Sequence, residues 1–220
     1  MAKIPITGAF HSPLAVAMGT RAKVVTLREL WRSGEPLSCQ EIARLGGMAF
    51  RSIDLALTDL LATGLVERVG GRRERLVRAA AGHRLAPAVA ALLRAEADFF
   101  PAIRSELSAV ARSGDSEIEA VAIIGAVADG VERPSDMLQL LVVTSTEPGV
   151  RRWVDRFVAA GAGMTTRFGV RIDVTGYDLT TARRMWATRT PAAERLVRGA
   201  KSIVGPPLEQ LFEESGGGSS

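Results

Sequence analysis

The segment from residue 38 to residue 63 constrains the fold most strongly, because its pattern predicts two short helices separated by a glycine turn. Ser38 suits the N-cap of the first helix, and Gly46-Gly47 ends it. The second helix is expected over residues 50–63. Apolar side chains recur there at the spacing of one buried stripe: Ile53, Leu57 and Leu60. With a further helix expected over residues 21–32, the pattern predicts a helix–turn–helix unit preceded by one more helix.

A basic hairpin is expected directly after these helices. Gly64 stands where a left-handed helix end is favoured, and residues 65–69 and 73–78 alternate like two strands around a turn at residues 70–72. Five arginines lie on this hairpin: Arg68, Arg72, Arg73, Arg75 and Arg78. This order of helix, turn, helix and basic wing is that of a winged helix–turn–helix, a module that commonly binds duplex DNA.

We expect the second helix to present its first turn to base edges in double-stranded DNA and the wing to contact the DNA backbone. The predicted base-reading residues are Phe50, Arg51 and Ser52, and the predicted backbone contacts are Arg68, Arg72, Arg73 and Arg75. Beyond Arg51, the outward positions of this helix carry no second cation. A winged helix used for dimerisation or protein docking therefore stays open as the alternative.

Charge divides the chain unequally. Residues 1–114 carry 16 Lys and Arg against 10 Asp and Glu, a net charge of +6, whereas residues 115–220 carry 12 against 14, a net charge of −2. This division is expected if only the first half meets phosphate. The expected parts are an N-terminal arm and winged helix over residues 1–85, a linker and dimerisation helix over 86–114, a second domain over 115–214 and a flexible Gly/Ser tail over 215–220.

The linker is one long helical pattern over residues 86–112, and Pro101 inside it is expected to kink or divide the helix. Its apolar residues can form a helix–helix seam: Leu92, Leu93, Ala97, Phe100, Ile103 and Leu107. A long helix after a winged helix commonly pairs with its twin, so a homodimer is expected.

The second domain alternates between strand and helix patterns. Strands are expected over residues 118–124, 138–143 and 170–177, and helices over 148–160, 179–186, 191–201 and 208–212. The expected fold class of the whole chain is therefore α+β, with an α/β second domain.

Residues 124–143 resemble the signature of the DNA polymerase beta-type nucleotidyltransferases, especially the minimal ones. In that family a glycine and serine precede a small helix, and two aspartates on the following strand hold Mg²⁺ against a triphosphate. Gly125 matches the glycine, Gly130 matches a loop glycine, and Ser135-Asp136 matches the first carboxylate.

Two positions depart from that pattern. Ala126 stands where the phosphate-binding serine belongs, and Leu138 stands where the second metal-ligating aspartate belongs. Asp173 matches the third carboxylate, or alternatively lies at a strand end on the surface. Mg²⁺ needs closely placed anionic oxygens, so the resemblance implies an inactive domain without metal or cofactor. The vestigial nucleotide site that it implies consists of Gly125, Ala126, Ser135, Asp136 and Asp173.

The order of the parts is similar to a family of bacterial transcriptional regulators, in which a MarR/ArsR-like winged helix and a long helix precede a minimal nucleotidyltransferase domain. The similarity covers nearly the whole chain from about residue 20. It implies a DNA-binding regulator whose second domain serves ligand sensing, dimerisation or partner docking, with a nucleotide or other small molecule as effector. Two alternatives remain: an enzyme that the winged helix only targets, and an antitoxin-like module that neutralises a partner.

Other features exclude several classes of protein. Cys39 is the single cysteine, which excludes a disulfide framework and a thiolate metal cluster; a half-buried structural role is expected, with a redox sensor as the alternative. His11 and His83 are too isolated to form a metal site. The N-terminus lacks a secretion signal and no apolar run is long enough to span a bilayer, so we expect a soluble cytoplasmic protein without a membrane partner.

Overall fold

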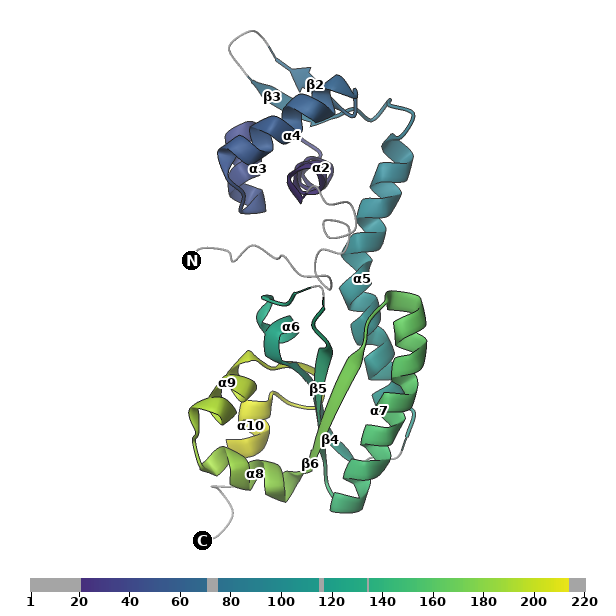
Figure 1. Ribbon diagram of the computed structural model, residues 1–220, viewed down its shortest axis with the longest axis vertical. Helices are drawn as coiled ribbons and strands as arrows, with labels where there is room; N and C mark the ends of the chain where they lie inside the picture. Colours follow the sequence, from purple (N-terminus) through teal and green to yellow (C-terminus); the bar gives the residue numbers. More distant parts are fainter. Residues whose placement is uncertain (1–20, 71–74, 115–116, 134, 214–220) are drawn as a thin grey trace. The chain divides into compact units, whose positions relative to one another are not determined.

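The computed structural model describes residues 21–70, 75–114, 117–133 and 135–213 (Figure 1). The chain forms two compact units, Met1–Asp98 and Phe99–Ser220. The boundary falls inside helix α5 (Ala86–Arg112), which continues through Pro101 and is not divided there. Helices and two sheets make up the described residues, so the mixed α+β class is confirmed.

The described residues of the N-terminal unit form three complete helices and a small sheet. Its elements are α2 (Arg21–Ser33), β1 (Leu37–Ser38), α3 (Cys39–Gly46), α4 (Phe50–Ala62), β2 (Val66–Val69) and β3 (Leu76–Ala79), followed by the first part of α5. The antiparallel sheet has the order β1-β3-β2, with Leu37 and Arg68 on either side of Val77. The short strand β1 is an element that the sequence analysis did not predict.

Local chemistry explains where α3 and α4 begin and end. Ser38 and Glu41 form a capping box, in which the Glu41 backbone N–H donates to the Ser38 hydroxyl and the Ser38 N–H donates to the Glu41 carboxylate. Gly47 ends α3 in the left-handed conformation, with φ of 61°. The predicted stripe of α4 is buried against α2 and α3, and Ile53 is fully inaccessible. Capping therefore sets the ends of α3, and hydrophobic periodicity sets the buried face of α4.

The C-terminal unit is built on a four-stranded sheet. Its elements are β4 (Ile118–Ile124), α6 (Gly125–Asp129), β5 (Leu138–Thr144), α7 (Glu147–Phe168), β6 (Ile172–Asp178), α8 (Leu179–Ala187), α9 (Pro191–Gly199), β7 (Lys201–Val204) and α10 (Leu208–Glu213). The sheet order is β6-β5-β4-β7; β5 and β6 run parallel, and the other pairs are antiparallel.

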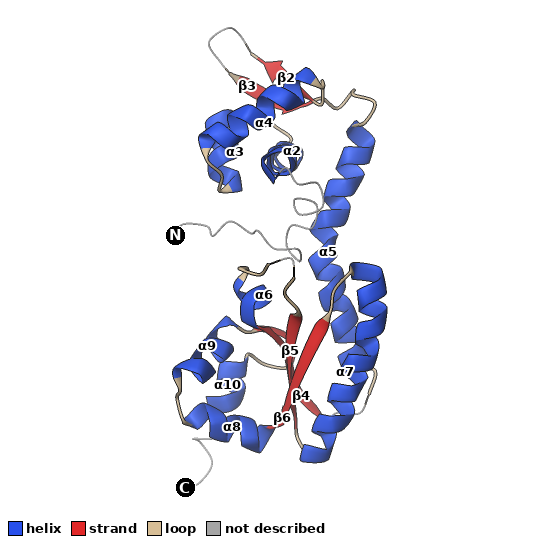
Figure 2. Ribbon diagram, viewed as in Figure 1, coloured by secondary structure: helices blue, strands red, loops and turns tan. Residues whose placement is uncertain are grey.

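Helices cover both faces of this sheet (Figure 2). On one face α7 packs on β5 and β6, and α7 in turn contacts the second part of α5, where the Phe99 and Phe168 rings meet edge to face at 5.7 Å. On the other face α8, α9 and α10 cover an apolar cluster that includes Ala122, Leu141 and Val143. Because β4 and β5 are buried on both faces, they are long apolar runs in the sequence.

Two sequence expectations for these parts need correction. The predicted helix over residues 191–201 ends at Gly199, and Lys201 begins β7, which pairs with β4. A four-residue edge strand is too short to show a period of its own, so its partner decides its conformation. Ile103 and Leu107, which the sequence places in a seam with a second copy, are instead fully buried within their own unit. Leu92 of the same predicted seam is exposed.

A buried ion pair links α2 to α5 within the N-terminal unit. The Arg28 guanidinium donates to the Glu96 carboxylate at 2.8 and 3.1 Å, and the Glu96 side chain is only 4% exposed. The Lys23–Asp59 pair joins α2 to α4 in the same unit, but the Asp59 side chain is 60% exposed. The two pairs have similar chemistry and very different burial.

Glu96→Ala is expected to destabilise the N-terminal unit by about 2–3 kcal/mol, because it leaves a largely buried guanidinium without its carboxylate. Asp59→Ala should cost less than about 1 kcal/mol, because water screens the exposed pair. Urea unfolding of the full chain, followed by ¹⁹F NMR of 5-fluorotryptophan at Trp31 in α2, measures both losses in this unit. Equal losses in the two variants would contradict the role assigned to burial.

Candidate functional site

The first turn of α4 presents an exposed surface. Phe50 is 57% exposed, Arg51 is exposed, and Ser52 is half-buried, so the first two predicted base-reading residues face solvent and the third does so in part. The N-cap residue Ala49 makes no side-chain hydrogen bond to the helix, in contrast to the capping box of α3. The Ser52 N–H donates to the Ala49 carbonyl, so the N–H groups of Phe50 and Arg51, which no described side chain caps, are the ones available to an acceptor outside the helix.

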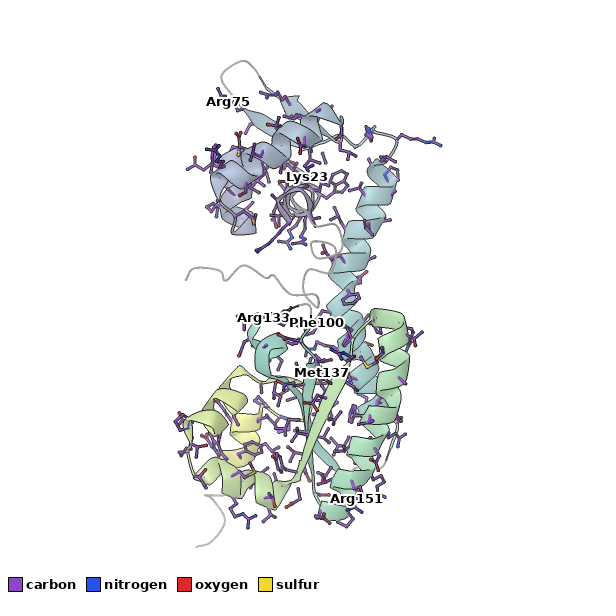
Figure 3. All side chains as sticks on the ribbon, in the orientation of Figure 1. Lys23, Arg75, Phe100, Arg133, Met137 and Arg151 are labelled. Atoms are coloured by element: carbon purple, nitrogen blue, oxygen red, sulfur yellow. The ribbon has the colours of Figure 1, made fainter. Side chains whose placement is uncertain are left out.

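The hairpin adds two exposed cations to this unit. Arg68 on β2 and Arg75 just before β3 are exposed, and neither forms an ion pair with a described residue. Figure 3 labels Arg75. Arg78 differs, because it lies directly opposite Glu67 across the hairpin and pairs with it at 2.6 Å. Residues 71–74, which include the predicted contacts Arg72 and Arg73, lie outside the described residues.

The outward face of α4 beyond its first turn is not basic. Asp54 and Leu55 are exposed, Leu55 at 61%, and Asp59 is paired with Lys23. The cations of this surface thus lie at the start of α4 and on the hairpin. Such a distribution suits contacts to phosphate more than extended readout of base edges.

Cys39 lies at the start of α3, where its thiol points toward the carbonyl of Phe50 with Sγ and O 3.8 Å apart. Burial and, to a smaller extent, the negative charge of Asp54 raise the pKa of the Cys39 thiol. A thiol with a raised pKa carries little thiolate at neutral pH and is a poor nucleophile. These properties fit the structural role and argue against the redox sensor.

The C-terminal unit contains a cavity of about 400 Å³ between the sheet and the helices α6, α8, α9 and α10. Three aromatic residues line it, Tyr177, Trp186 and Phe212, together with the polar residues Asp129, Gln139 and Thr175. Cavities of this size and lining commonly bind small molecules. The cavity overlaps in part with the nucleotide site that the sequence implies.

Residues of that implied site do not all come together. Gly125 lines the cavity, and Ala126 follows it in α6. Ser135 and Asp136 lie in the loop before β5, near Arg133 and Met137 (Figure 3). The Asp136 carboxylate accepts a hydrogen bond from the Arg133 backbone N–H at 2.7 Å, and neither Ser135 nor Asp136 is among the cavity-lining residues. Asp136 therefore stabilises its own turn.

Alternation along β5 decides which side chain reaches the cavity. Leu138 is fully buried on the face toward α7, while Gln139 points to the opposite face and lines the cavity. Gly125 has a φ of +70°, which favours glycine, and Gln139 Oε1 lies only 2.1 Å from where a Cβ atom would stand. The side chain beside Gly125 is thus an amide, one position later than the residue that the sequence pattern indicates.

Asp173 is the strand neighbour of Gln139 in the parallel pairing of β5 and β6, and it is exposed. Gln139 on β5 beside Asp173 on β6, with Asp129 at the end of α6, does not supply the adjacent pair of carboxylates that two magnesium ions need. Among the described residues, no three His, Cys, Asp or Glu side chains gather as a metal site. These residues do not fit the paired Mg²⁺ site of the nucleotidyltransferases.

The cavity also contains polar groups that the sequence analysis did not identify as a site. Within the described part of the chain, the side chains of Asp129, Gln139, Thr175 and Tyr177 make no hydrogen bond, and the buried indole N–H of Trp186 has no partner. One signal was available in the sequence, because Gln139 is the single polar residue before Thr144 in an otherwise apolar strand. The other groups come from separate elements and have no common sequence pattern.

No protein-family model and no curated protein matches this sequence. Among solved structures, a toxin–antitoxin complex with AMP-PNP is 11% identical over 50% of this chain and 82% of that chain, with a TM-score of 0.35. A mutant of the toxin–antitoxin MntA-HpeT is 10% identical over 50% and 81%, with a TM-score of 0.34. PigF with SAH is 17% identical over 78% and 61%, with a TM-score of 0.24. Similarity at this level does not by itself establish a common fold or function.

One further structural observation concerns membranes. Of the helices in the described ranges, none is long and apolar enough to cross a lipid bilayer.

The reactivity of Cys39 tests the environment at the start of α4. We expect iodoacetamide to alkylate Cys39 more slowly in the folded protein than in urea, with a rate that rises about tenfold per pH unit from pH 7 to 8 because the thiolate is the reacting form. Asp54→Asn should lower the pKa of the thiol and raise the rate, because it removes a neighbouring negative charge. Mass spectrometry across a pH series gives the pKa separately from accessibility.

Asp59→Asn is the matched control, since Asp59 is on the same helix but does not contribute to the raised pKa of Cys39. A pKa in the folded protein below that of the urea-denatured chain would contradict the assignment and return the redox sensor to consideration.

Proposed function

We propose that the protein is a DNA-binding transcriptional regulator, in which the N-terminal unit is a winged helix–turn–helix and the C-terminal unit is a nucleotidyltransferase-like module without transferase activity. One observation carries the proposal. The order helix, strand, helix, helix, strand, strand, with sheet order β1-β3-β2, brings the exposed first turn of α4 and a basic hairpin into the same small unit. This combination fits the way such modules engage duplex DNA.

The chemistry of the surface supports contacts to the DNA backbone. The N-terminus of α4 offers backbone N–H groups that no side chain caps, and Arg51 stands beside them. A helix N-terminus attracts anions through its dipole and its free donors. Arg68 and Arg75 supply two more positive charges that no described carboxylate neutralises.

We assign base recognition to the exposed residues Phe50 and Arg51. The guanidinium of Arg51 can donate two hydrogen bonds to a guanine edge, and the ring of Phe50 can contact a thymine methyl group. The acidic and apolar groups that follow, Asp54 and Leu55, limit how far along α4 such readout extends. Recognition is therefore proposed to concentrate at the start of the helix.

The proposed lack of transferase activity follows from the side chains around Gly125. Transfer of a nucleotide by this class of enzyme needs two metal ions held between carboxylates. Gln139 occupies the position beside Gly125, and Asp136 is engaged in its own turn. We further propose a homodimer in which the exposed Leu85 and Leu92, beside and within α5, contact a second copy.

Duplex DNA from upstream of the protein's own gene, compared with a scrambled duplex at two salt concentrations, tests DNA binding by fluorescence anisotropy. We expect a preference of about a hundredfold for the native site that persists at the higher salt concentration. Arg68→Ala and Arg75→Ala should each weaken binding to both duplexes alike and lower the salt slope by about 1, because each removes a phosphate contact. Arg51→Ala should cost about 1–3 kcal/mol for the native duplex and reduce the preference.

Arg94→Ala is the matched control, because Arg94 is an exposed arginine of α5 in the same unit. Unchanged affinity and salt slope in all three test variants would show that this surface does not bind DNA. If the wild-type protein bound neither duplex, the docking alternative would replace the proposal.

A second measurement addresses the enzyme alternative. Purified protein incubated with Mg²⁺, radiolabelled ATP and either total RNA or itself should incorporate no label above the level of the Asp173→Asn variant, since the paired carboxylates are missing. Mg²⁺-dependent incorporation that disappears in Asp136→Ala or Asp173→Asn would establish a transferase and overturn this part of the proposal.

A further inference from the structure

We propose that the cavity of the C-terminal unit binds a small organic cation, specifically an amine with an aromatic body and a hydrogen-bond acceptor. This proposal does not depend on DNA binding, because it concerns a separate unit and a different class of ligand. It is carried by the walls of the cavity, by one buried donor without a partner and by the charge at the cavity.

The walls suit an aromatic body. Trp186 and Phe212 lie with their ring centroids 6.3 Å apart and inclined by 45°, and Tyr177 lines the same space. Met185, beside Trp186 in α8, adds a flexible thioether. A volume of about 400 Å³ accommodates a single aromatic ring with a short side chain.

The buried donor requires an acceptor. Trp186 is 5% exposed, and its indole N–H has no hydrogen-bond partner among the described residues. A buried donor without a partner destabilises the protein, and such groups are rare in folded structures. An oxygen of a ligand in the cavity that Trp186 lines would satisfy it.

The charge at the cavity favours a cation. Asp129 lines it, and its carboxylate packs so closely on Gly199 that an added Cβ there would lie 2.4 Å from Oδ1. Among the side chains that the structure describes, no Lys or Arg lines the cavity; those of Arg195 and Arg198 in α9 lie outside the description. Two arginines near Trp186 have partners: Arg183 donates to the Leu211 carbonyl, and Arg189 stacks on the Trp186 ring at 4.3 Å and pairs with Glu213.

These charges disfavour a nucleoside triphosphate. A triphosphate would bring several negative charges toward Asp129 without a described cation to receive them. Since Arg189 already covers one face of the Trp186 ring, the carboxylate of Asp129 is the natural partner for the ligand's ammonium group. Neutral donors and acceptors on Gln139, Thr175 and Tyr177 remain to orient the rest of the molecule.

Three probes with one body test this proposal on the full chain: tyramine is a cation, tyrosol is neutral, and 3-(4-hydroxyphenyl)propionate is an anion. Each carries the same phenol oxygen as an acceptor. Binding is followed by the ¹⁵N–¹H signal of the Trp186 indole, identified by its absence in Trp186→Phe. We expect tyramine to bind tightest, the propionate to bind at least about tenfold more weakly, and the indole signal to move on binding.

Asp129→Asn should remove the preference for tyramine and leave the affinity for tyrosol unchanged, because the two side chains have the same shape. Asp155→Asn, at an exposed aspartate of α7 on the other face of the sheet, should change neither affinity. Trp186→Phe should weaken all three probes alike, measured by calorimetry.

Several results would overturn the proposal. They are the absence of binding by all three probes, equal affinity for the cation and the anion in the wild-type protein, and a preference for tyramine that survives in Asp129→Asn. Tighter binding of ATP with Mg²⁺ than of tyramine, with movement of the Trp186 signal, would assign the cavity to a nucleotide instead.

Discussion

The two central strands of the C-terminal sheet, β4 and β5, must be covered on both faces, and the rest of that unit depends on this requirement. Apolar side chains alternate toward α7 on one face and toward α8, α9 and α10 on the other. Long, continuous α7 packs directly on β5 and β6, where Gly176 lets the valines of α7 approach the sheet. The opposite face is covered by three short helices, which fill it less completely and leave the cavity beside Gly125. The cavity thus lies on the face of the sheet that short helices cover.

The N-terminal unit is organised by how its helix ends are satisfied. In α3 the reciprocal hydrogen bonds of Ser38 and Glu41 use the first backbone donors within the chain, and they also lower the pKa of the Glu41 carboxyl. In α4 no side chain takes that role, because Ala49 has no acceptor. The two neighbouring helices therefore differ at their N-termini: α3 is capped by its own side chains, whereas α4 has no side-chain cap and has the exposed Arg51 in its first turn.

Much of this fold is predictable from the sequence, because burial imposes a period on it. The stripe on α4 and the apolar run of β4 both predict their elements closely. Features that depend on a distant partner are not predictable in this way. Strand β7 exists because β4 offers it hydrogen bonds, the approach of Gln139 to Gly125 depends on strand register, and the unsatisfied indole of Trp186 is a property of its surroundings in three dimensions. The motif pointed to Ser135, Asp136 and Leu138, but the loop residues do not line the cavity, and on β5 it is Gln139 that faces it.

The pairing of β7 with β4 also has a consequence for how the protein is made. The strand that opens this sheet in the sequence receives its last neighbour from residues 201–204, close to the end of the described chain. Until those residues leave the ribosome, β4 has an unpaired edge whose side chains from Ala120 onward are apolar. Exposed apolar edges of this kind invite pairing with other chains. Completion of this sheet therefore waits until residues 201–204 have been synthesised, about eighty residues after β4.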